Sequence, residues 1–92
     1  MNEVEKIISE TLKEVNMMDK LESDIESFYK ETLRRITNQE IDIAVEEISE
    51  GKYGVEVFFK DKVFWMTSKA WDTVREITIN VMEVINELQL AR

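Results

Sequence analysis

The sequence predicts an α+β domain in which two helices precede a three-stranded antiparallel meander and a third helix follows, packed on the sheet. Three observations predict this order. Apolar residues recur with helical spacing at both ends of the chain, they alternate with a period of two in the middle, and short turn segments separate the alternating stretches. A length of 92 residues supports one modest core, so we expect a single domain over residues 1–92.

Two N-terminal segments have the pattern of amphipathic helices. A first helix is expected over about 3–15, where an apolar residue recurs every three or four positions. A second is expected over about 20–37, because a capping box runs from Asp19 to Glu22. Helical spacing also continues between the two segments, so one long bent helix over 3–37 is the alternative.

Three segments with the alternation of β-strands come next. They are expected over about 41–48, 53–60 and 63–66. Turn residues around Gly51 and Asp61 separate them, and three successive strands with such short links form a meander.

The last segment again has helical spacing. Thr67 and Ser68 are candidate N-caps, so we expect this helix over about 69–90. Its broad apolar stripe, which runs from Trp71 to Leu88, is suited to pack on the sheet.

The second and third strands carry apolar residues at both alternating sets of positions. If helices cover one face of the sheet, the other face keeps apolar side chains, and such a face usually marks an interface. We therefore expect a homodimer with Phe58, Phe64 and Met66 in its interface. The alternative is a local aromatic pair between Phe58 and Phe64 across the hairpin.

The composition argues against most catalytic chemistry. The chain has no Cys and no His, so it lacks a thiolate, Cys-ligated zinc and the usual general base at neutral pH. We also find no EF-hand spacing and no nucleophile–base spacing, so we expect a binding protein with no catalytic residues, no cofactor and no metal site. No apolar run approaches ~18 residues and no secretory signal pattern is present, so we expect a cytoplasmic protein that does not enter a membrane.

The negative charge is concentrated in the first half of the chain. The net charge is −8; residues 1–50 hold 14 acids and 6 bases, whereas residues 51–92 hold 6 of each. This balance argues against direct binding to nucleic acid and indicates a charged partner. The alternative is an acidic face that serves only to keep the protein in solution.

Rows of helical carboxylates can imitate a phosphate track. Carboxylates at i and i+4 lie about 6 Å apart on a helix, and two phosphate steps along one DNA strand rise about 7 Å. A DNA-binding protein that presents Lys and Arg would accept such a row. The candidate partner-binding residues are Glu10, Glu14, Glu22, Glu26, Asp42, Glu46 and Glu47.

The segment from Met17 to Tyr29, together with the small acidic chain and its lack of Cys, His and Pro, resembles the Arn family of anti-restriction proteins of T-even phages. The resemblance implies a dimeric DNA mimic without catalytic residues. Its implied partner is a DNA-binding host protein, either the modified-cytosine-specific restriction endonuclease McrBC or a nucleoid protein. From the residues alone, the alternative is a small acidic regulator or chaperone-like adaptor that binds an ordinary protein surface.

Overall fold

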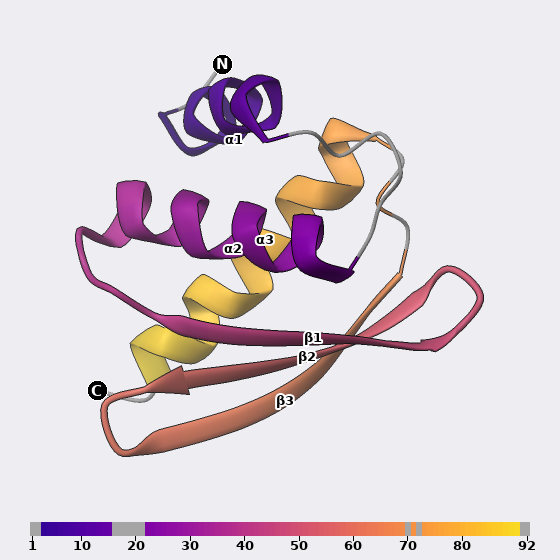
Figure 1. The fold of residues 1–92 in the computed structure, drawn as a ribbon. Helices are drawn as coiled ribbons and strands as arrows, with labels where there is room; N and C mark the ends of the chain where they lie inside the picture. The colour runs from indigo at the N-terminus through magenta and orange to yellow at the C-terminus, as the bar shows by residue number, and fades with distance from the viewer. Residues whose placement is uncertain (1–2, 16–21, 70, 72, 91–92) are drawn as a thin grey trace.

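The computed structural model describes residues 3–15, 22–69, 71 and 73–90. It confirms the α+β order of two helices, a three-stranded antiparallel sheet and a C-terminal helix. The elements are α1 (Glu3–Glu14), α2 (Glu22–Thr37), β1 (Asp42–Ser49), β2 (Lys52–Phe59), β3 (Lys62–Lys69) and α3 (Val74–Leu90). In Figure 1, α2 and α3 lie on one face of the sheet, and α1 packs across them on the side away from the strands.

The two N-terminal helices are separate, so the alternative of one long helix over 3–37 is wrong. Arg35 near the end of α2 hydrogen-bonds to Glu14 at the end of α1, 21 residues earlier. A continuous helix would hold these two residues about 32 Å apart. The expected capping box begins at Asp19, which lies outside the described residues.

Strand β2 lies at the centre of the sheet and pairs antiparallel with both neighbours. Val55 lies opposite Val45 on one side and Met66 on the other. The register between β1 and β2 shifts between Glu47 and Ser49, which is the mark of a β-bulge. The ladder between β2 and β3 is continuous from end to end.

The boundary between β3 and α3 differs from the prediction. Strand β3 continues through Thr67 and Ser68 to Lys69, and α3 begins only at Val74, because the ladder with β2 extends to the pair Lys52–Lys69. The Thr73 hydroxyl caps α3 instead, since it accepts a hydrogen bond from the backbone N–H of Glu76 at 3.2 Å. Thr67 and Ser68, the predicted caps of this helix, therefore belong to strand β3.

The aromatic centre of the core joins α2 to the connection between β3 and α3. Trp71 was expected on the last helix, but it lies before that helix and is only 4% exposed. Its indole packs edge-on against Phe28 and Tyr29, with ring centroids 6.0 and 5.0 Å away. The Tyr29 and Ser68 hydroxyls form a buried hydrogen bond of 3.1 Å, and burial raises the pKa of Tyr29.

Removing the Tyr29 hydroxyl tests this contact. We expect Tyr29→Phe to lower the free energy of unfolding by about 0.5–1.5 kcal/mol, because it removes one buried hydrogen bond and leaves the Ser68 hydroxyl without its partner. Urea titrations of Tyr29→Phe, Ser68→Ala and the double variant measure the coupling. The double variant should lose less than the sum of the single losses, and full additivity would mean that the two hydroxyls do not interact.

Candidate interaction surfaces

Five carboxylates from two distant segments lie toward one edge of the molecule, with Glu47 on the helix side of the sheet and Glu46 on the face away from the helices. Helix α2 runs beside β1, so its first two turns lie next to the end of that strand (Figure 1). We call this surface the acidic rim; it consists of Glu22, Glu26, Glu46, Glu47 and Glu50. All of these residues are exposed except Glu26, which is half-buried.

A hydrogen bond joins the two halves of the acidic rim. The backbone N–H of Glu47 donates to a carboxylate oxygen of Glu22 at 3.2 Å. Tyr53 lies opposite Glu47 on β2, and its pKa is raised by burial, by the charge and hydrogen bond of Glu47, and by the charge of Glu22. The carboxylates of Glu22 and Glu47 therefore both lie close enough to the Tyr53 hydroxyl to raise its pKa.

The rim contains four of the seven carboxylates predicted to bind a partner. Of the other three, Asp42 lies at the opposite end of β1, beside a shallow pocket that Lys30 and Arg34 also line. Glu10 and Glu14 belong to α1, in the layer away from the sheet, and Glu14 is hydrogen-bonded to Arg35. The seven residues thus do not form one surface.

Glu50 is a rim residue that the predicted set omits. It lies in the turn between β1 and β2, directly after the strand that carries Glu46 and Glu47. The signal that points to it in the sequence is the stretch 36–51, which contains five acids and no base.

The basic side chains of α2 are bound to carboxylates away from the first turn. Lys30 pairs with Glu26 at 3.5 Å, and Arg34 pairs with Glu31 at 2.5 Å. Arg35 pairs with both Glu31 and Glu14, and so ties α2 to α1. Lys30 thus pairs with one rim carboxylate, that of Glu26, whereas none of the basic residues of α2 lies in the first turn of the helix, which carries Glu22.

The sheet face opposite the helices carries exposed apolar side chains together with carboxylates, among them Glu56 on the central strand opposite Trp65. Side chains of all three strands point to it, and four large apolar ones are exposed: Ile48, Phe58, Val63 and Trp65, at 49, 37, 61 and 52%. The Trp65 ring lies over Gly54, where a Cβ atom would come within 2.2 Å of the indole. We call this surface the open face.

The predicted dimer residues lie on different faces of the sheet. Phe58 pairs with Val63 and belongs to the open face, whereas Phe64 and Met66 point toward the helices and pack against the core. The pairs Phe58–Val63 and Val57–Phe64 follow from a two-residue turn at Lys60 and Asp61, which sets Phe59 opposite Lys62. The alternative of a Phe58–Phe64 aromatic pair is therefore wrong.

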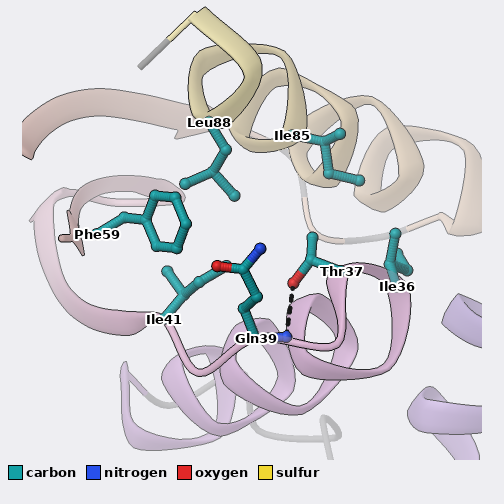
Figure 2. A pocket seen from close by; sticks show the side chains of 7 residues that line it. All are labelled: Ile36, Thr37, Gln39, Ile41, Phe59, Ile85 and Leu88. Atoms are coloured by element: carbon teal, nitrogen blue, oxygen red, sulfur yellow. Dashed lines mark hydrogen bonds between the residues drawn. The ribbon is translucent and has the colours of Figure 1, made fainter. Parts of the chain in front are cut away.

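A cavity of about 250 Å³, lined by both apolar and polar side chains, opens between the ends of α2 and α3. Its lining consists of Ile36, Thr37, Gln39, Ile41, Phe59, Ile85 and Leu88. Figure 2 shows the Gln39 side chain reaching toward this space, while its backbone N–H donates to the Thr37 hydroxyl at 3.3 Å. None of these lining residues is ionisable, so they offer no group for acid–base chemistry.

Comparison of the chain with protein-family models, curated proteins and solved structures finds no match. Within the described residues, no group of three or more His, Cys, Asp or Glu side chains is arranged to hold a metal ion. In the same part of the chain, no helix has the length and apolar character needed to cross a membrane.

The pH dependence of stability tests the ion pairs that Glu31 makes with Arg34 and Arg35 within α2. Hydrogen bonds from Arg34 and Arg35 lower the pKa of Glu31 below its ordinary value of 4.5. A lowered carboxyl pKa stabilises the fold above the unfolded-state pKa, and this contribution is lost as the pH falls through the folded-state value.

We therefore expect Glu31→Gln to lower the free energy of unfolding at pH 7 by up to about 1 kcal/mol, the range of exposed ion pairs. The difference from the wild type should shrink as the pH falls below 4.5. Urea titrations at a series of pH values measure it, and Glu10→Gln, which removes an exposed carboxylate of α1, is the matched control. A difference that stays constant between pH 7 and pH 3 would contradict the assignment.

Proposed function

We propose that this protein is a DNA mimic, which offers the acidic rim to the DNA-binding site of another protein, such as a restriction endonuclease or a nucleoid protein. The observation that carries the proposal is the placement of α2 and β1 carboxylates at one edge, where the Glu22 carboxylate accepts a hydrogen bond from the backbone N–H of Glu47. A site built for DNA presents Lys and Arg spaced for phosphates, and these side chains gain from a matching array of anions.

The dimensions support contact with part of one DNA turn. The molecule measures 33 × 32 × 17 Å, and one turn of DNA is about 34 Å long and carries about 20 phosphate charges. A net charge of −8 falls short of that number, so the protein can replace only some of the phosphates. Because the acids gather at the rim, the local charge density is higher than the net charge indicates.

The contribution of each carboxylate is small. An exposed ion pair is worth about 0.2–1 kcal/mol, so no single rim residue decides the affinity. Several pairs together, in the low dielectric of a protein–protein contact, sum to a useful binding energy. The effect of substitutions should therefore accumulate.

A competition assay tests the proposal. A labelled DNA duplex is bound to McrBC or to a purified nucleoid protein, and fluorescence anisotropy reports its release when the acidic protein is added. We expect the wild type to displace the duplex and a variant with Glu22, Glu26, Glu46 and Glu47 all changed to Gln to lose this ability. A single change should weaken binding by a few-fold at most.

The control variant carries four Glu→Gln changes outside the rim, at Glu3, Glu10, Glu76 and Glu87. It has the same net charge as the rim variant and should displace the duplex as the wild type does. Equal loss in both variants would show that only net charge matters. Simultaneous binding of duplex and protein to the target, with unchanged affinities, would rule out mimicry for that target.

The open face favours a second candidate function, that of a small adaptor which binds an ordinary protein surface. Ile48, Phe58, Val63 and Trp65 present exposed apolar side chains on one face of the sheet, as interfaces do. Salt separates the two functions. Binding through the rim should weaken steeply between low and physiological ionic strength, whereas binding through the open face should hardly change.

A further inference from the structure

The two edges of the sheet differ in how they are protected. Unpaired strand edges invite pairing with another chain, and proteins block them with charges, bulges or covering elements. The β1 edge has all three, because it carries Glu46 and Glu47, bulges between Glu47 and Ser49, and lies under α2. The Glu22 carboxylate also occupies the backbone N–H of Glu47.

The β3 edge has no bulge and no covering element among the described residues, and its only charged residues are Lys62 and Lys69 at its two ends. Its residues 63–68 contain no charge and no Pro, and its ladder with β2 runs without a bulge. In the part of the chain that the structure describes, no other segment hydrogen-bonds to its outer side. Val63 and Trp65 on this strand are among the most exposed large apolar residues described.

We propose that β3 pairs antiparallel with β3 of a second copy, across a two-fold axis that passes through Trp65. A strand edge is complementary to another strand edge, and the two copies would share one six-stranded sheet. The axis must pass between one residue and the same residue of the second copy. Only then does each helix-facing residue lie opposite another helix-facing residue, so that the helices of both copies lie on the same side of the joined sheet.

The pairing along β3 favours an axis at Trp65 over the neighbouring residues. With the axis at Trp65, residues 62–68 of the two copies pair, and Lys62 lies opposite the uncharged Ser68. An axis at Phe64 would shorten the paired stretch to residues 62–66, and an axis at Met66 would set Lys69 opposite the apolar Val63.

The side chains between these ends also match. Phe64 would lie opposite Met66 on the helix side, and Val63 opposite Thr67 on the open side, both favourable kinds of cross-strand pair. Phe64 and Met66 are half-buried in one copy, so a neighbouring strand would cover more of both. Two of the three residues predicted for a dimer interface thus fall in it, and Phe58 on the central strand does not.

A groove beside β3 provides electrostatic complementarity. Trp65 and Met66 line it together with α3 residues, which include Glu83 and Glu87. A second β3 laid along this edge brings its own Lys62 to the helix side of the sheet, opposite Ser68 and two residues along the strand from Met66 of this groove. Because the β1 edge is protected in both copies, association should stop at two.

Sedimentation at micromolar concentration tests the proposal. The wild type should sediment as twice the 10.9 kDa monomer. In the proposed register, residue 63 lies opposite residue 67 of the second copy. Val63→Lys with Thr67→Lys should therefore weaken the dimer at least about tenfold by repulsion, and Val63→Glu with Thr67→Lys should restore it.

The matched control places two lysines on the open face of β1, at Ala44 and Ile48, which are both exposed. This variant should remain a dimer, and the circular dichroism and thermal melt of every variant should report a folded protein. A wild type that sediments only as a monomer would overturn the proposal. So would dissociation of the Ala44/Ile48 variant, which would mean that the open faces stack, or failure of the Glu–Lys variant to recover the dimer.

Discussion

Burial of one stripe of α2 against the sheet is the contact on which the other features depend. Ile25, Tyr29 and Leu33 on this stripe are completely buried, and they fix how α2 is rotated above the strands. That rotation sets the row of Glu22 and Glu26 beside the end of β1, and it turns the opposite flank of the helix, with Arg35, toward α1. The acidic rim and the Arg35–Glu14 ion pair between α2 and α1 are therefore two consequences of one packing arrangement.

The same packing explains why the sheet is unevenly covered. Three strands have two faces and two edges, and α2 with α3 covers one face, while α2 also covers the β1 edge. The described part of the chain contains no further helix or strand that covers the open face or the outer edge of β3. Val63 and Trp65 therefore keep their apolar side chains in contact with water in the monomer. Removing such surface from water is favourable.

Local patterns were sufficient to predict the order and kind of every element, because helix and strand periods are properties of neighbouring residues. They failed at Thr67 and Ser68, which have cap chemistry but are held in β3 by pairing with β2. The contact between Glu22 and Glu47 joins residues 25 positions apart, so no local pattern contains it. The separation of Phe58 from Phe64 depended on turn length, since moving the register by one residue exchanges the two faces.

The two tryptophans of this chain lie in opposite environments. Trp71 is enclosed by Phe28 and Tyr29 at 4% exposure, whereas Trp65 lies over Gly54 with about half its surface in water. Their intrinsic fluorescence should accordingly differ in emission wavelength and in access to a dissolved quencher. One emission spectrum thus contains two separate signals. The signal of the buried Trp71 should change when the core loosens, and that of the exposed Trp65 should change when another molecule binds to the sheet.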